Sequence, residues 1–300
     1  MVNLRPRFKL GETHRFTLTL KNLSKQVKAE SDAGGGEGGK GAGAMEMTQE
    51  LGLSLKAVEE RAGGGWGLDL VYDSIKLTMK QGDGEAITLD SGAPGGGKKG
   101  EELDELGGLF SPLVGLTLRV EMDANGNISE LKSGGGGGGG EGKGEMGDVS
   151  GLISSLGGGS MGGGLGSGDL VNSLLGPVTS SRAGTGEARV GDSWTNEDLV
   201  DGAGGKMKLT TVHTLQSHRD GVATLDQKGR VDLQPVSAGA GSGVGSGVPT
   251  IRESMFSGRT VWSTREGMLD SMTFKQKLVI ETGREGTSFN EMDVRVVRRK

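Results

Sequence analysis

The stretch MEMTQELGLSL, residues 45–55, decides the fold that this sequence predicts. Nearly every second residue in it is apolar, and the residues between are polar or glycine. Successive side chains of a strand point to opposite faces, so this period of two predicts a strand with one buried face. Residues 66–72 alternate in the same way, but the apolar positions change parity from Ile75 onward. We therefore expect a β-bulge or a tight bend at Asp73-Ser74.

Other stretches repeat this alternation and extend the prediction along the chain. They are residues 14–22, 116–122, 128–132, 207–215, 221–225, 231–233, 260–263, 268–282 and 289–296. Asn125-Gly126, Gln227-Lys228-Gly229 and Arg265-Glu266-Gly267 predict turns between neighbouring strands. The expected fold class is mainly β: an antiparallel, curved sheet or half-barrel from two similar halves, with long disordered Gly-rich loops.

Glycine is abundant and clustered, since 61 of the 300 residues are Gly. The low-complexity clusters lie at residues 33–44, 133–147, 156–168 and 237–248. Such segments gain nothing from burial and lose much backbone entropy on ordering, so we expect flexible loops. The predicted organisation is an N-terminal β-rich half (1–132), a Gly-rich flexible linker with short helices (133–186), and a C-terminal β-rich half (187–300).

Two hairpins support the expectation of similar halves. Residues 115–131 and 258–272 each contain Gly-x-Thr, a strand, a Gly turn and a return strand, which aligns Gly115 with Gly258. Each half also opens on a polar turn, Gly11-Glu12-Thr13 or Gly191-Asp192-Ser193. Unrelated hairpins share such features, so duplication and plain hairpin similarity both stay open.

The composition argues against several classes of function. The chain has no Cys, and therefore no disulfide framework and no thiol nucleophile. A net charge of -5 and a pI near 5.4 argue against binding of nucleic acid. No apolar run approaches the roughly 18 residues of a transmembrane segment. The stretch GAPGGGKK, residues 92–99, falls short of a phosphate-binding loop, because Lys99 replaces the hydroxyl residue that would hold magnesium. We expect no cofactor and no metal site.

Two motifs, Tyr72-Asp73-Ser74 and Asp192-Ser193-Trp194, are the candidate ligand-binding residues. In one interpretation, the Asp and Ser side chains bond nearby backbone groups and the aromatic residue anchors a structural turn. In the other, the two turns flank a shared ligand mouth. Leu and Met residues of the sheet would then hold an apolar ligand, although the pattern favours a plain core for them. These residues are Met47, Leu51, Leu53, Leu68, Leu70, Met79, Leu118 and Met122.

A catalytic interpretation is the alternative. Ser193, His213 and Asp192 could form a serine-type hydrolase site, but no Gly-x-Ser-x-Gly elbow accompanies them. His213 alternates with Leu209 and Leu215, which is typical of a core histidine. We assign no catalytic residue. The sequence favours a binding or structural module over an enzyme, and a purely structural protein without a ligand is a further alternative.

The order of several short motifs carries a family resemblance. They are Phe8-Lys9-Leu10-Gly11-Glu12, Val71-Tyr72-Asp73-Ser74, Leu116-Thr-Leu-Arg-Val120 with Asn125-Gly126-Asn127-Ile128, Pro177-Val178, and Val190-Gly191-Asp192-Ser193-Trp194. In this order the chain resembles an uncharacterised bacterial family, a domain of unknown function in predicted cell-envelope proteins and lipoproteins. The resemblance implies a β-rich protein of the periplasm or the extracellular space, with no established activity and no catalytic residues to carry over.

The expected partner is an apolar small molecule or a lipid. The opening residues Met1-Val-Asn-Leu-Arg-Pro6 lack the pattern of a signal peptide, which leaves a cytoplasmic location as the alternative.

Overall fold

The computed structural model describes residues 1–27, 43–92, 113–123, 128–133, 186–202, 205–233, 250–281 and 286–300. The described residues confirm the prediction of a mainly β, antiparallel fold. The strands are β1 (Val2–Asn3), β2 (Thr13–Val27), β3 (Met45–Glu60), β4 (Trp66–Gln81), β5 (Ile87–Asp90), β6 (Thr117–Met122), β7 (Ile128–Ser133), β8 (Glu187–Ala188), β9 (Ser193–Gly202), β10 (Gly205–Arg219), β11 (Val222–Leu233), β12 (Thr250–Ser263), β13 (Met268–Glu281) and β14 (Thr287–Arg299).

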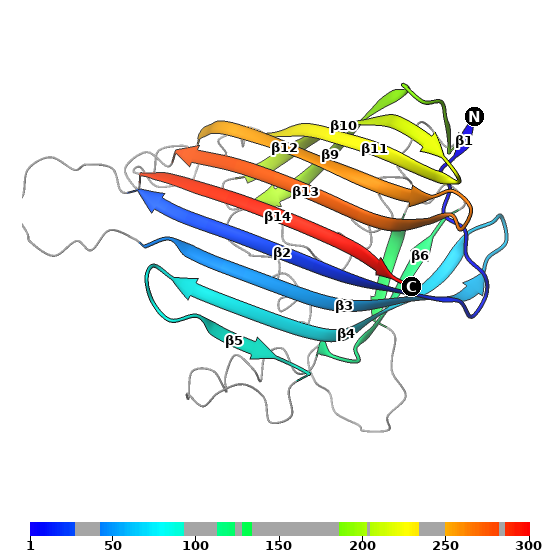
Figure 1. Ribbon diagram of the computed structural model, residues 1–300, viewed down its shortest axis with the longest axis horizontal. Helices are drawn as coiled ribbons and strands as arrows, with labels where there is room; N and C mark the ends of the chain where they lie inside the picture. The colour runs from blue at the N-terminus through cyan, green and yellow to red at the C-terminus, as the bar shows by residue number, and fades with distance from the viewer. Residues whose placement is uncertain are drawn as a thin grey trace, which may run out of the picture.

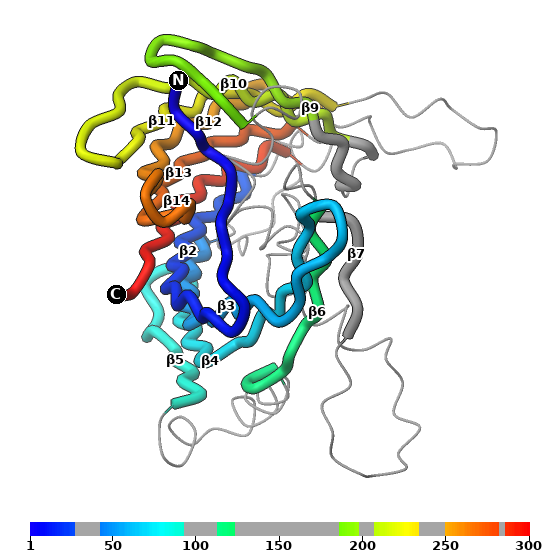
Figure 2. Tube along the Cα trace, turned by 90° about the vertical axis from the view of Figure 1, so that its right-hand side faces the viewer, coloured from blue at the N-terminus to red at the C-terminus, as the bar shows by residue number. Residues whose placement is uncertain are grey.

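One large antiparallel sheet contains all strands except β1 and β8 (Figure 1). Its order is β7-β6-β4-β3-β2-β14-β13-β12-β11-β10-β9, and β5 adds to β4. The first and last long strands of the chain, β2 and β14, pair in the middle, where Leu20 stands opposite Val294. The sheet curves strongly without closing into a barrel (Figure 2). It therefore has a concave inner face and a convex outer face.

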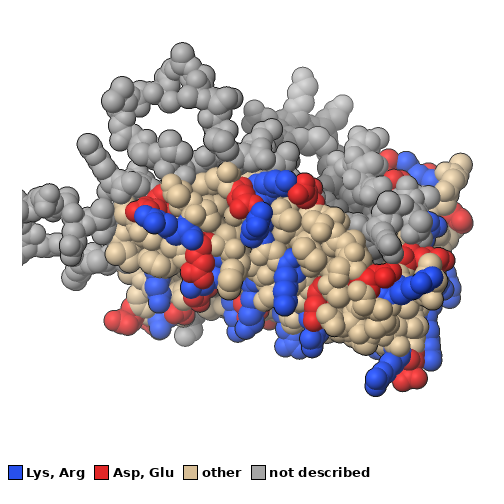
Figure 3. Space-filling model, turned by 90° about the horizontal axis from the view of Figure 1, so that it is seen from above, with Lys and Arg blue, Asp and Glu red and all other residues tan. Residues whose placement is uncertain are grey.

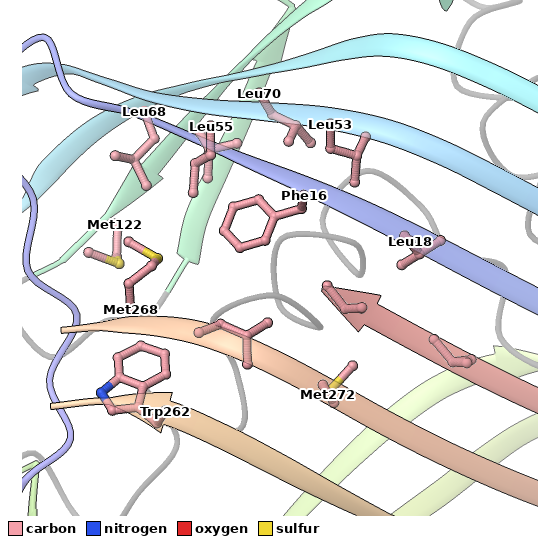
Figure 4. Packing of buried hydrophobic residues seen from close by; sticks show 14 of the residues in the cluster. Phe16, Leu18, Leu53, Leu55, Leu68, Leu70, Met122, Trp262, Met268 and Met272 are labelled. Atoms are coloured by element: carbon pink, nitrogen blue, oxygen red, sulfur yellow. The ribbon is translucent and has the colours of Figure 1, made fainter. Parts of the chain in front are cut away.

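The hydrophobic core lies on the inner face. The alternation of the sequence sends Phe16, Leu18 and Leu20 of β2 inward. Phe16 stands opposite Leu53 and Leu18 opposite Leu51 of β3, and all five side chains are buried. Figure 4 shows the inner side chains of β2, β3 and β4 facing Trp262, Met268 and Met272 from β12 and β13. Because two walls of one curved sheet face each other, the described strands bury a core between these walls.

The N-terminal segment crosses one end of the curved sheet (Figure 2). β1 pairs with β8, and the N–H of Leu4 donates to Gly186 O at 2.8 Å. The N–H of Arg7 donates to Gly267 O, in the turn between β12 and β13, at 2.9 Å. The rings of Phe8 and Trp66 lie 5.7 Å apart. This segment therefore links strands that are far apart in the sheet order.

The bulge expected in β4 is confirmed. Ser74 stands opposite Gly52 and Tyr72 opposite Leu53, so Asp73 is the extra residue. The strand continues through it as far as Gln81. This extra residue causes the change of parity, because Tyr72 and Ile75 then both point to the inner face.

The turn expected at Gln227-Lys228-Gly229 is wrong, because β11 runs through these residues without a break. Gly229 stands opposite Phe256, and a Cβ on Gly229 would collide with the Phe256 ring and with Thr210 O. The glycine is there for a close approach of a ring, and not for a turn. The turn at Arg265-Glu266-Gly267 is confirmed, and Gly267 has a positive φ of 63°.

The turns that precede β2 and β9 make the same three backbone hydrogen bonds. Gly11 donates to Ala57 O, Ala57 donates to Glu12 O, and Glu12 donates to Lys9 O. In the other turn, Gly191 donates to Leu215 O, Leu215 to Asp192 O, and Asp192 to Arg189 O. Both glycines have a positive φ, 81° and 94°. The register then shifts by one residue immediately after Ala57 in β3 and after Leu215 in β10.

These shared features match five strands of the first half, β2, β3, β4, β6 and β7, with β9 to β13. The match also aligns two cross-strand ion pairs, Asp69 with Arg119 (3.1 Å) and Asp226 with Arg259 (2.8 Å). It corrects the alignment expected from sequence, because Leu118, and not Gly115, takes the position of Gly258. The two similar halves stay a prediction, which these matches support.

Some predictions lie outside the described residues. They are most of the Gly-rich linker, its short helices, the turn at Asn125-Gly126, and Pro177-Val178.

Candidate functional site

The first candidate motif lies at the bulge of β4, and its residues point to different sides. The Tyr72 side chain is 1% exposed and belongs to the core. Asp73 is exposed and accepts a hydrogen bond from the Ser54 hydroxyl at 2.6 Å. Asp73 therefore braces the bulge through a side chain of β3, whereas the structural-turn interpretation expects a bond to a nearby backbone group.

The second candidate motif begins β9, the last strand of the sheet path. Asp192 Oδ2 accepts the N–H of Arg189 at 3.0 Å, within the turn before the strand. The Ser193 and Thr214 hydroxyls share a hydrogen bond of 2.8 Å. Trp194, the next residue, is buried. Tyr72 and Trp194 both reach the core, but Asp73 and Ser193 do not, and seven strands separate β4 from β9 in the sheet order.

The residues of the hydrolase alternative do not meet. His213 stands opposite Trp194 in the register and is 4% exposed. Ser193 is exposed and stands opposite Thr214, so its side chain lies on the other face of the sheet from His213. A serine nucleophile needs its base within hydrogen-bond reach. This pair is therefore not a catalytic site.

Trp194 and His213 instead form a stacked ring pair on the inner face. Their ring centroids are 5.7 Å apart and their planes differ by 9°. His213 Nε2 and Asn196 Nδ2 lie 3.3 Å apart. Burial lowers the pKa of His213 to about 4, so the imidazole is neutral at neutral pH. The prediction that His213 faces inward is confirmed.

The inner face also carries a polar patch that the sequence analysis missed. It consists of Asn196, Thr211, His213, Gln227 and Thr260. Four of its five side chains are buried, with Thr260 at 0% and Gln227 at 5% exposure. The Gln227 amide donates to the Thr260 hydroxyl at 3.0 Å. Buried polar groups are costly unless they are paired, so such a patch in a core needs an explanation.

Three uncharged donors buried in the hydrophobic core have no hydrogen-bond acceptor among the described residues. They are the hydroxyl of Tyr72 and the indole N–H groups of Trp194 and Trp262. Burial raises the pKa of Tyr72 to about 12, so the phenol keeps its proton. Leaving such a donor unpaired costs about 1–3 kcal/mol.

Charged side chains are almost confined to the outer face. On the part of the surface that Figure 3 shows from above, acidic and basic side chains are interspersed without a large patch of one sign. Among the described inner side chains, Arg298 carries a permanent positive charge, and its Nη2 atom contacts both Asp270 and Glu266. His14 lies close to this cluster. Burial lowers the pKa of His14, while Glu12 raises it to a smaller extent. The positive charge of Arg298 is thus already paired with carboxylates, which leaves it less available to an anionic ligand.

The described residues contain no helix of the length and hydropathy needed to cross a membrane. Within the same residues, no group of three or more His, Asp or Glu side chains is placed to hold a metal ion. Comparison of the sequence with models of protein families gives no match, and comparison with curated proteins gives none either. The resemblance to an envelope family therefore stays a prediction, and the function is argued from geometry.

Proposed function

We propose that this protein is a non-catalytic binding module whose inner face takes an apolar small molecule or a lipid. The observation that carries the proposal is the set of buried donors on that face. Tyr72, Trp194 and Trp262 each hold an O–H or N–H group away from water without an acceptor among the described residues. A bound molecule with an acceptor atom would relieve this cost.

The surroundings of these donors support an apolar ligand. The hydrophobic core to which these three residues belong is rich in Leu, Met and Phe side chains. Met side chains adapt to irregular partners, and Met47 and Met292 lie only partly buried beside the core. Both stand opposite Asn22 in the register, so they share the inner face.

The test is binding of the neutral apolar dye N-phenyl-1-naphthylamine to the full chain, followed by fluorescence. We expect saturable binding, weakened by Met292→Glu, because a carboxylate in an apolar site is costly. Met255→Glu is the matched control, since Met255 is 63% exposed and lies on the outer face. Circular dichroism is the check that both variants keep the β fold.

Absence of saturable dye binding by the folded protein would contradict the proposal and favour a purely structural role. If Met292→Glu and Met255→Glu changed the affinity for the dye equally, the dye would bind elsewhere than on the inner face.

The location in a cell envelope is likewise a proposal, supported by the resemblance of motifs given above. Fractionation of cells that make the protein tests it, and recovery in the cytoplasmic fraction alone would contradict it.

A further inference from the structure

The inner face differs in polarity between the two matched sets of strands. The shared turns and bulges place Leu55 at the position of His213, and Leu70 at that of Gln227. The same match places Val120 at the position of Thr260. Phe16 and Leu53 likewise match Asn196 and Thr211. One wall of the concave face is thus apolar at five positions where the other wall carries hydrogen-bonding side chains.

We propose that the ligand is an uncharged amphiphile, with a hydrocarbon chain on the apolar wall and a hydroxyl- or ester-bearing head on the polar patch. This rests on the proposed function and names its ligand class. The polar patch contains both donors and acceptors in the Gln227 amide and the Thr211 and Thr260 hydroxyls, and Gln227 donates one hydrogen bond to Thr260 within the patch. The neighbouring Trp194 adds an unpaired indole N–H. A glycerol ester has the complementary groups.

The charge distribution selects a neutral head over an anionic one. The inner side chains of β10, β11 and β12 that the structure describes include no Lys, Arg, Asp or Glu. Arg298, on β14, is occupied by Asp270 and Glu266. Burial lowers the pKa of His213 to about 4, so this ring supplies no positive charge at neutral pH. An anionic head group on this wall would be buried without a positively charged partner.

Competition against N-phenyl-1-naphthylamine tests this ligand class with three probes: monoolein, oleate and octadecene. We expect monoolein to displace the dye at about tenfold lower concentration than octadecene, the gain expected from one net hydrogen bond. Oleate, at a pH well above its carboxyl pKa, should displace the dye less effectively than monoolein.

Gln227→Leu combined with Thr260→Val copies the apolar wall onto the polar patch, since these residues match Leu70 and Val120. We expect the double variant to lose the preference for monoolein and to bind octadecene as the parent does. The control is Thr224→Val, which makes a similar change on the outward-facing side of β11.

The outcomes separate the two proposals. A protein that binds the dye but prefers oleate, or has equal affinity for monoolein and octadecene, overturns the ligand class and keeps the binding module. An unchanged monoolein preference in the double variant overturns the placement of the head group. A folded protein that binds no dye and no probe overturns both proposals.

Discussion

The indole of Trp194 lies parallel to the imidazole of His213, with 5.7 Å between ring centroids and 9° between planes. The two residues stand opposite each other, so the contact ties β9, the last strand of the sheet path, to β10. The stacked ring pair is formed by a buried His213. Burial lowers the pKa of this imidazole from 6.5, the value for the unfolded chain, to about 4. Protonation therefore opposes folding at this position.

Stability should fall as the pH drops from about 6.5 toward about 4, the window set by the lowered pKa of His213. Here the unfolded chain binds the proton and the folded chain does not, so the loss reaches at most about 3 kcal/mol. Urea unfolding across this pH range measures it. His213→Leu should flatten the profile in part only, because burial also lowers the pKa of His14. Parallel profiles for the parent and the variant would contradict the argument.

The hydrogen bond between Gln227 and Thr260 gives a second prediction, on stability alone. Thr260→Val leaves the Gln227 amide without its acceptor in a buried position, which should cost about 1–3 kcal/mol. Adding Gln227→Leu removes the stranded donor, so the double variant should be more stable than Thr260→Val. A double-mutant cycle by urea unfolding measures the difference. Additive losses would mean that the two side chains act independently.

Local patterns in the sequence were enough to predict most of the long strands and the bulge, but not β9 or the first part of β12. Alternation around Leu53 and Leu70 identifies buried faces, and the change of parity after Tyr72 marks Asp73 as the extra residue. Glycine positions are less informative, because glycine occurs both where the backbone φ is positive and where another group approaches the backbone closely. Gly267 has the first role and Gly229 the second, and neighbouring residues do not distinguish them.

The polar patch could not be predicted, because its members come together only through pairing between strands. Gln227 and Thr260 are separated by 33 residues, and His213 alone is typical of a core histidine. The relation between the two walls depends on register shifts after Ala57 and Leu215. An alignment of hairpins by their first glycines misses this register, and with it the match of Leu70 to Gln227.

The turns at Gly11 and Gly191 should respond alike to substitution. A Cβ at either position meets nothing within 4 Å, while φ is 81° and 94°, a backbone region that side chains other than glycine disfavour. Alanine should therefore cost about 1–2 kcal/mol at each site through the backbone alone. Gly11→Asn should cost less than Gly11→Ala, because Asn tolerates this region better. Thermal unfolding compares the variants, and a much larger loss at one turn would contradict their equivalence.

The matched arginines, Arg119 and Arg259, should differ in their effect on stability despite their equivalent positions. Arg119 contacts both Glu59 and Asp69 and is 23% exposed, whereas Arg259 contacts Asp226 and is 61% exposed. Exposed pairs are screened by water and salt, while a partly buried arginine with two carboxylates keeps more of its interaction.

The comparison of Arg119→Met with Arg259→Met tests this difference, since Met keeps most of the aliphatic stem. Arg119→Met should lower the free energy of unfolding by about 1 kcal/mol, because two carboxylates lose a partly buried partner. Arg259→Met should give no measurable change. High salt should narrow the gap between the two variants, because it weakens the ion pairs that the parent retains. A loss at Arg259 equal to that at Arg119 would show that the stem, and not the second carboxylate, sets the contribution.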